Sequence, residues 1–335
     1  MNMARRSNKR KMKNIEPAVQ TFTMGIPVGP FATVDATVDL SQMASLLNRR
    51  FYRQGLNWAV SGFKCKTSQT GSIDIAKLPN TWVMSNSWTK GFKTWQEMNR
   101  KALDEADSVS GRFLDFKIYA DSAHHSNGYA NNLLPVDFAG NQAVPGEWIP
   151  SEIRTPLGGA GTLPYEIIAT GDNYPGVGAS GKDAVSLIQG YANSRSLPSE
   201  SDPNTPAEVT DAAGATPENW MSALSNEGTN QDSEVLADIT AYDQPPYPYE
   251  NDGTAVTTQY PGGGTQLPGL QAHDFQNFTG TTISKITYLK GGNFPCGLIR
   301  LRAANTSDQP DVFIVQIDLV PGSHRGYMAE SMLEM

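Results

Sequence analysis

One stretch of the sequence has the spacing of a phosphate-binding loop. Gly176-Val-Gly-Ala-Ser-Gly-Lys182 matches the GxxxxGK pattern, in which backbone N–H groups and a lysine hold the phosphates of a nucleotide. The pattern continues with Ser or Thr, whose hydroxyl binds Mg²⁺, but this chain has Asp183, a carboxylate that would lie beside the phosphates. Residues 166–173 form only a short strand with polar ends, followed by Pro175, and the segment after Asp183 is ambiguous and stops at Gly190. Neither flank gives the strand–loop–helix context that such a site requires, so we interpret the stretch as a flexible loop and not as an NTPase site.

The histidines are the next candidates for acid–base or metal chemistry. His124 and His125 are adjacent, which seldom lets both bind one ion, and His273 and His324 are isolated. No Asp, Glu or His lies at ligand spacing from the pair, and the chain has no HExxH or Gly-x-Ser-x-Gly motif. We expect the pair on a surface loop, and we predict no enzyme activity, no cofactor and no metal site.

The cysteines and several acidic residues complete the reactive side chains. Cys65 and Cys296 each stand alone, without a CxxC pair or a zinc-ligand spacing. We predict two buried free thiols, although a disulfide between them is not excluded by the sequence. Calcium at a subunit junction is left open, with Asp115, Asp121 and Asp137 as acidic candidates.

The N-terminus has a different chemistry, because its first fourteen residues carry six basic side chains and no acidic one. The six are Arg5, Arg6, Lys9, Arg10, Lys11 and Lys13. The rest of the chain has 20 Lys and Arg against 34 Asp and Glu, a net charge of -14 compared with -8 for the whole. Like charges at this density repel, so we predict that residues 1–16 form a disordered arm that binds a polyanion. Nucleic acid fits, since each neutralised phosphate releases counterions and gives affinity without sequence preference.

The basic N-terminus has two other possible roles. Short basic runs also act as nuclear-import signals, either in addition to nucleic-acid binding or in place of it. A signal peptide is excluded because no apolar segment follows the basic residues; residues 15–28 are interrupted by Glu16, Pro17 and Gln20.

The composition indicates a globular, strand-rich protein. Of the 335 residues 39% are hydrophobic, and only 18% are charged, compared with about 25% in typical domains. With 31 Gly and 22 Pro the chain favours strands joined by long loops. No apolar run reaches about 18 residues, so no transmembrane helix and no membrane partner are expected.

The hydrophobic patterns predict mostly strands. After an extended segment at 17–40, strands are expected at 56–66, 73–78, 113–119, 148–154, 165–169, 184–189, 234–242, 283–290 (continuing through 297–302) and 312–319. The segment 113–119 has the clearest alternation, and 312–319 is apolar enough to be buried on both faces. Long surface loops are expected at about 193–233 and 243–274.

Helices are predicted at three places. Residues 41–53 form a short amphipathic helix with Ser41 as its N-cap and Arg49, Arg50 and Arg53 in its last turn. Residues 85–106 have the strongest helical period, with a Trp and Phe stripe that faces the core, and a short helix is expected at 217–224. The chain has no βαβ rhythm. We predict an all-β fold: a single jelly-roll β-sandwich over 17–335 with long loops and two or three short inserted helices.

Three blocks of sequence carry a family resemblance: Ala4-Arg-Arg-Ser-Asn-Lys-Arg-Lys-Met-Lys, Trp82-Val-Met-Ser-Asn-Ser-Trp-Thr-Lys-Gly-Phe-Lys-Thr-Trp95 and Gly111-Arg-Phe-Leu-Asp-Phe-Lys-Ile-Tyr119. Together with the strand-rich body and long polar loops, they resemble the capsid proteins of small circular Rep-encoding single-stranded DNA viruses. The resemblance implies a single jelly roll, self-assembly into an icosahedral shell and packaging of the genome.

We therefore expect a structural capsid protein with its arm on the inside, against a single-stranded DNA genome. Six charges in each of about 60 copies give roughly 360 positive charges, fewer than the phosphates of a genome of about two thousand nucleotides. Other basic residues on the inner surface must therefore contribute, and Arg49, Arg50 and Arg53 are the candidates. The expected partners are other copies of the chain, the genome and a host receptor, and the expected location is the virion, with the host nucleus during assembly. The alternative is a soluble β-sandwich binding module whose arm is only a nuclear-import address.

Overall fold

The computed structural model describes residues 17–104, 115–156, 162–193, 269–281 and 284–333. The basic arm lies outside these residues, as do the helix predicted at 217–224, the strand predicted at 234–242 and most of the two predicted loops. The loop predicted at 243–274 is too long at its end, because a strand begins at Gln271.

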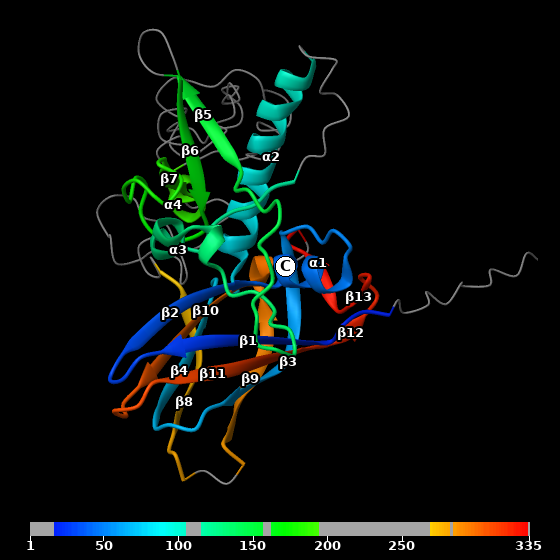
Figure 1. Cartoon of the computed structure of the whole chain (residues 1–335). Coiled ribbons are helices and arrows are strands. Elements are labelled where there is room, and N and C mark those ends of the chain that lie inside the picture. The colour runs from blue at the N-terminus through cyan, green and yellow to red at the C-terminus, as the bar shows by residue number, and fades with distance from the viewer. Residues whose placement is uncertain (1–16, 105–114, 157–161, 194–268, 282–283, 334–335) are drawn as a thin grey trace, which may run out of the picture.

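Each of the first four strands pairs antiparallel with one of four later strands, in reverse order along the chain. β1 (Thr21–Val28) pairs with β11 (Asp311–Leu319), β2 (Thr33–Asp39) with β10 (Leu298–Asn305), β3 (Leu56–Lys66) with β9 (Ile286–Phe294) and β4 (Gly71–Lys77) with β8 (Gln271–Phe278). Pairing of β11 with β3 and of β10 with β4 joins the pairs into two antiparallel sheets, β1-β11-β3-β9 and β2-β10-β4-β8 (Figure 1).

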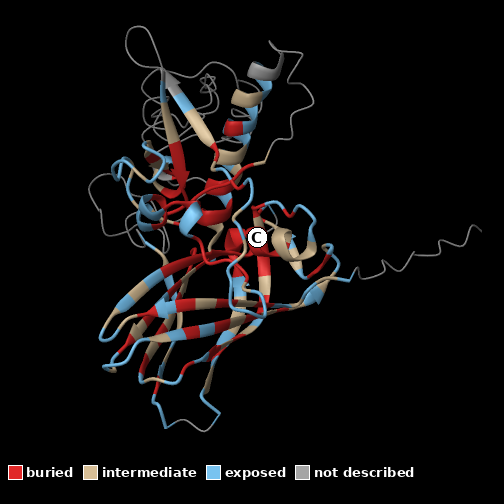
Figure 2. Cartoon of the chain, in the orientation of Figure 1, coloured by how far each residue is buried: buried red, intermediate tan, exposed pale blue. Residues whose placement is uncertain are grey.

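The main core lies between these two sheets. Alternate residues of β1 are buried, among them Phe22, Met24 and Ile26, as expected where successive side chains point to opposite faces of a sheet. Burying each such side chain stabilises the fold by about 1.5–3 kcal/mol. The prediction that 312–319 is buried on both faces is wrong. On the outer face of β11, Val312 is 51% and Ile314 39% exposed, so this strand is buried on one face only (Figure 2).

The helix α1 (Leu40–Asn48) connects β2 to β3. Its N-cap is Asp39 and not Ser41, because the Asp39 carboxylate accepts hydrogen bonds from the N–H groups of Ser41 (2.9 Å) and Gln42 (3.3 Å). The helix ends at Asn48, and its C-cap Arg49 has a left-handed φ of 53°. The helix predicted at 41–53 is therefore too long, and Arg49, Arg50 and Arg53 lie after its last turn.

The described helices and strands between β4 and β8 form the other lobe of the molecule in Figure 1. Its described elements are α2 (Trp82–Asp104), α3 (Ser122–Asn127), η2 (Tyr129–Asn131), β5 (Glu152–Pro156), β6 (Thr162–Ile168), β7 (Asp183–Ser186) and α4 (Leu187–Asn193). β5 pairs antiparallel and β7 parallel with β6. A second core cluster lies here, and the stripe of α2 faces it as predicted, with Trp88 and Trp95 buried against Phe116.

Two predicted strands of this lobe have other bounds in the structure. The strand at 148–154 begins only at Glu152, and 184–189 divides into β7 and α4 because the Ser186 hydroxyl accepts the Gln189 N–H at the start of the helix. The described residues hold four α-helices in place of two or three short ones, and α2 alone spans 23 residues. The chain is nevertheless sheet-rich, with curled antiparallel sheets.

The clearest predicted strand, 113–119, is not a strand in its described part. Only Tyr119 makes a bridge, to Ile168. The N–H groups of residues 117 and 118 donate to side chains and not to a neighbouring strand: the Ile118 N–H donates to Gln54 Oε1 (2.7 Å) and the Lys117 N–H to the Ser151 hydroxyl (2.9 Å). Alternation of apolar residues records burial on one side and does not reveal such partners.

The remaining short elements lie near the C-terminus. They are η4 (Pro295–Gly297), the hairpin of β12 (Pro321–Gly322) and β13 (Gly326–Tyr327), and β14 (Ala329–Ser331), which extends the first sheet beside β3. Among the described helices, none combines the length and the apolar character needed to cross a membrane.

Candidate nucleic-acid interface

The attachment point of the basic arm is fixed at the end of α1. The Val19 N–H donates to Asn48 Oδ1 (3.0 Å), and the Tyr327 hydroxyl donates to the Val19 carbonyl (2.6 Å). The Asn48 amide in turn donates to the Tyr327 hydroxyl (2.7 Å). These three bonds join the first described residues to α1 and to the β12–β13 hairpin, so the arm leaves the body between these elements.

The three inner-surface candidates lie at the same place. Arg49 follows Asn48 directly at the end of α1, and Arg50 and Arg53 continue toward β3. All three are exposed, whereas Tyr52 and Gln54 between and beside them are buried. The structure therefore brings Arg49, Arg50 and Arg53 together beside the arm's attachment point, while the six arm residues themselves lie outside the described chain.

Sequence reasoning missed a fourth cation and an aromatic ring at this end. His324 and Arg325 form the turn of the β12–β13 hairpin, closed by paired backbone hydrogen bonds between His324 and Tyr327 (2.9 and 3.0 Å). Arg325 has a left-handed φ of 49° and donates from Nη1 to the Phe51 carbonyl (2.5 Å). The only local signal was a basic pair before Gly326, and nothing in the sequence relates it to residues 49–53.

A pocket of about 610 Å³ lies between the hairpin and the segment after α1. Phe51, Arg53, Leu56, His324 and Arg325 line it, so two cations accompany a mostly apolar wall and no lining residue is acidic. Burial, followed by the charge of Arg325, lowers the pKa of His324, which keeps the ring neutral at pH 7. The pocket can hold a flat apolar group with a negative charge at its edge.

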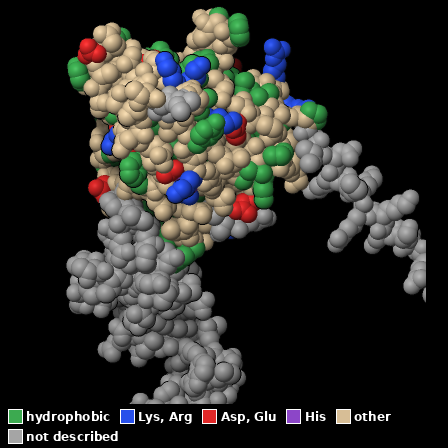
Figure 3. Space-filling view, turned by 90° about the horizontal axis from the view of Figure 1, so that it is seen from below, with side chains coloured by type: hydrophobic (Ala, Val, Ile, Leu, Met, Phe, Trp, Pro, Cys, Tyr) green, Lys and Arg blue, Asp and Glu red, His purple; other side chains and the backbone are tan. Residues whose placement is uncertain are grey.

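The sandwich elsewhere has no comparable gathering of one charge in the view of Figure 3. Seen from the strand turns, Lys and Arg side chains alternate with Asp and Glu, and hydrophobic side chains lie among them. Two of the cations on the sheets are paired: Arg302 with Asp35 (2.7 Å) and Lys64 with Asp318 (2.6 Å). Such pairs compete with phosphates for the cation.

The GxxxxGK stretch forms a loop, as predicted, and is followed by β7 and not by a helix. The Asp183 carboxylate accepts the N–H of Gly176 (3.0 Å), and Lys182 pairs with Glu152. An amide and the lysine that would hold phosphates in an NTPase are thus engaged by acidic side chains of the same chain.

His124 and His125 are not on a surface loop, since they are buried in the short helix α3. His124 Nε2 lies 2.9 Å from Asn132 Oδ1, and its Nδ1 accepts the Ala120 N–H (3.1 Å). Burial lowers the pKa of His124 to about 3. His125 Nε2 lies 3.0 Å from the buried Glu166 carboxylate. Glu166 belongs to β6, so the histidine pair joins α3 to β6 and contributes to the packing of this lobe.

The other reactive side chains also have local partners. Cys65 and Cys296 are buried free thiols, as predicted, and burial raises the pKa of Cys65 to about 12. The three acidic calcium candidates lie apart: Asp115 pairs with Lys117, Asp121 with Arg300 (2.6 Å), and Asp137 accepts the Asn141 N–H (2.8 Å). Within the described ranges, no group of three potential metal ligands occurs.

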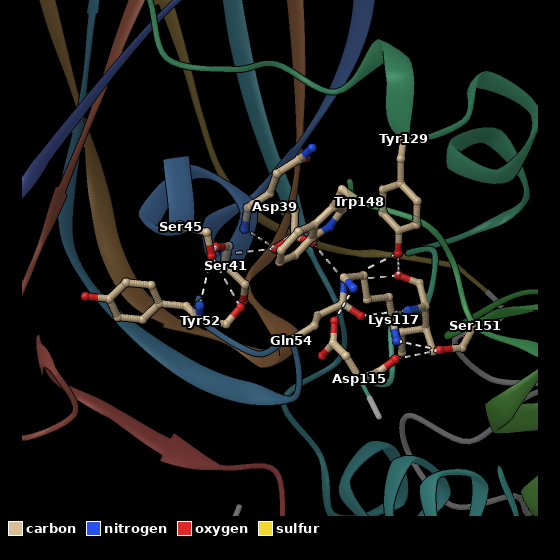
Figure 4. Close-up of polar contacts among 12 residues, drawn as sticks. Asp39, Ser41, Ser45, Tyr52, Gln54, Asp115, Lys117, Tyr129, Trp148 and Ser151 are labelled. Carbon is tan, nitrogen blue, oxygen red and sulfur yellow. Dashed lines mark hydrogen bonds and ion pairs between the residues drawn. The ribbon is translucent and has the colours of Figure 1, made fainter. Parts of the chain in front are cut away.

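A buried polar network joins the two lobes beneath α1 (Figure 4). Asp39 accepts hydrogen bonds from Gln54 Nε2 (2.9 Å) and Trp148 Nε1 (3.0 Å), besides the two amides at the start of α1. Burial raises the pKa of Asp39 to about 6, and these four donors limit the rise. The Tyr129 hydroxyl donates to the Ile118 carbonyl (2.5 Å), which is also a Gln54 partner. The network positions the segment 49–56 and with it the wall of the pocket.

Comparison with known proteins gives no relative: no family model, no curated protein and no solved structure matches the chain.

Proposed function

We propose that this chain is a viral capsid protein, which assembles with other copies of itself into an icosahedral shell and packages a nucleic-acid genome. The observation that carries the proposal is the reverse-order pairing of β1–β4 with β8–β11. Eight strands paired in this way and curled into two sheets are what two interlocked Greek keys would give. We therefore assign the sandwich to the jelly-roll type, which capsid proteins use, along with lectins and cupins.

The basic N-terminus favours a capsid among these uses. Six cations precede a body with a net charge of -14, and the body attaches them beside Arg49, Arg50 and Arg53. The six cations of the arm together with Arg49, Arg50, Arg53 and Arg325 make ten basic side chains in one copy, so about 60 copies would supply roughly 600 charges to the genome phosphates. We assign the end of the body where the arm attaches to the inside of the shell.

The proposal includes partners and location. A single-stranded DNA genome is the proposed polyanion, a host receptor would bind the outside, and the chain would act in the virion and, during assembly, in the host nucleus. The jelly roll and the anionic outer body require no membrane and no enzyme activity for these roles.

The test compares the full chain with a variant that lacks residues 2–14. Both proteins are purified, imaged by negative-stain electron microscopy and assayed for nucleic acid by the ratio of absorbance at two wavelengths. We expect particles from the full chain that contain nucleic acid, and much less nucleic acid in the variant. Failure of both proteins to form particles would reject the shell, whereas equal nucleic-acid content would reject the role of the arm.

One observation supports the second candidate, a soluble β-sandwich binding module whose arm is a nuclear-import address. The turn Asp137–Asn141, closed by the Asp137 side chain at 2.8 and 3.1 Å from Asn141 nitrogens, presents a fully exposed Phe138. A fixed aromatic residue on a loop is typical of recognition sites. A monodisperse monomer in size-exclusion chromatography would favour this candidate over the capsid.

A further inference from the structure

The pocket at the arm's attachment point combines rings, an apolar wall and cations, and none of its lining residues is acidic. Phe51 and His324 provide two rings, Leu56 an apolar wall, and Arg53 and Arg325 two cations. Its volume of about 610 Å³ lies within the range of roughly 300–1,000 Å³ that is usual for small-ligand sites.

The walls of the pocket are held in place by contacts on both sides. The Arg325 guanidinium binds the Phe51 carbonyl (2.5 Å), and the buried Tyr52 donates its hydroxyl to the Arg325 carbonyl (3.0 Å). The ring of Phe51 packs against Trp148, with ring centroids 5.9 Å apart, and the ring of Tyr52 against His324 at 6.5 Å. The hairpin and the segment after α1 therefore form one preorganised site.

We propose that this pocket binds a nucleobase of a single-stranded nucleic acid, with Arg53 and Arg325 contacting the phosphates beside that base. The inference rests on the proposed function, because it takes the genome that the arm would hold as the ligand. Proteins that bind single strands combine cations along the backbone with aromatic side chains on which bases stack. A neutral His324 ring suits stacking, and a duplex would not fit because its bases are already stacked against each other.

The consequence is a dependence on the base itself, which the arm alone cannot produce. Contacts of the arm with phosphates are equal for a strand with bases and for an abasic strand of the same length. Stacking of one base is worth about 5- to 150-fold in affinity. The ratio of the two dissociation constants therefore measures the pocket separately from the arm.

The experiment uses the full chain and two fluorescent 12-residue strands, one of thymidylate and one abasic, with binding followed by anisotropy. We expect the thymidylate strand to bind about 5- to 150-fold more tightly. The ratio should fall toward 1 in His324→Ala and in Phe51→Ala. The ratio should stay unchanged in Phe138→Ala, which removes an exposed ring outside the pocket. A 12-base-pair duplex should show no additional affinity from stacking of its bases in the pocket.

Three outcomes would overturn the inference. Equal binding of the two strands by the full chain would leave the arm and the shell intact and reject the pocket. A ratio that persists in both pocket variants would place base recognition elsewhere. No binding of either strand would reject the pocket together with the packaging role. If either ring variant fails to fold by circular dichroism, the same ring is replaced by Leu, which keeps an apolar side chain without a ring, and the ratio should again fall toward 1.

Discussion

Trp148 donates its indole N–H to the buried carboxylate of Asp39 over 3.0 Å, and so connects the inserted lobe to the end of β2. Both residues are buried, and they lie 109 positions apart in the chain. The same carboxylate caps α1 and binds Gln54. The position of α1, and of the basic segment after it, therefore depends on a contact between the two lobes.

Replacement of Trp148 by Phe should lower the free energy of unfolding by more than the smaller ring alone would cause. The variant removes a hydrogen bond to a buried charged group, which costs about 1–3 kcal/mol in the free energy of unfolding. Trp88→Phe is the matched control, because the Trp88 indole N–H is buried without an acceptor among the described atoms. Denaturant unfolding measures both variants, and equal losses would contradict the role of the Asp39 contact.

Asp39 should make the protein more stable in mild acid. Its pKa is about 6 in the folded chain and 3.8 as the unperturbed value, so the folded state binds the proton first. Stability from this group rises as the pH falls through 6 toward 3.8, by about 3 kcal/mol in total. Asp39→Asn removes the effect. From pH 7 to pH 4 the unfolding free energy of the variant should fall relative to that of the unchanged protein, by up to about 3 kcal/mol. Parallel profiles of the two proteins would reject the shifted pKa.

His124 acts in the opposite direction. Its pKa of about 3 in the folded chain compares with 6.5 as the unperturbed value, so only the unfolded state binds a proton between these values. Stability is therefore lost as the pH falls from 6.5 toward 3, by at most about 1.4 kcal/mol per pH unit. His124→Gln should remove this loss in the same unfolding series. Between pH 6 and 3.8 the two groups oppose each other, so each single variant should show a steeper pH dependence than the unchanged protein, in opposite directions. The double variant with Asp39→Asn should be about as flat as the unchanged protein in this range.

Much of the sandwich could be predicted from its sequence, because strand alternation reports burial directly. β3 begins and ends where the pattern places it, and the stripe of α2 faces a core. The prediction of a strand at 113–119 was wrong for a physical reason. The backbone of Ile118 forms hydrogen bonds with the side chains of Gln54 and Tyr129, and no local sequence pattern reveals these partners.

The candidate site could be predicted only in part, for a related reason. Arg49, Arg50 and Arg53 are close in sequence, so their proximity could be predicted, but they lie after the end of α1 and not in its last turn. Arg325 joins them only through the hairpin that closes onto Phe51, a contact across 274 residues. His124 and His125 were misplaced because polarity predicted exposure, whereas hydrogen bonds within the inserted lobe allow their burial.

Lys182→Ala should leave the protein intact, because the GxxxxGK loop holds no nucleotide in our interpretation. Lys182 and Glu152 form a partly exposed pair, about a third accessible on each side, and such pairs contribute about 0–1 kcal/mol. We expect a change in thermal midpoint of a few degrees at most. Addition of ATP and Mg²⁺ should shift neither protein, and an ATP-dependent shift that the variant loses would restore the NTPase hypothesis.

The salt dependence of single-strand binding should separate the arm from the body. Each phosphate contact contributes about 0.7 to the slope of log affinity against log salt concentration. Deletion of residues 2–14 removes six cations and should lower the slope by up to about 4, whereas replacement of Arg49, Arg50 and Arg53 together by Gln should lower it by up to about 2. Anisotropy titrations of a thymidylate strand from about 50 to 300 mM salt measure these slopes.

The control for this series is a cation of the other lobe. Lys93 is exposed on α2, away from the attachment point of the arm, and Lys93→Gln changes the net charge by one. Its slope should equal that of the full chain, because counterion release depends on contacts with phosphates and not on net charge. A triple variant that behaves like Lys93→Gln would place Arg49, Arg50 and Arg53 away from the nucleic acid, and the end of α1 would then not face the genome.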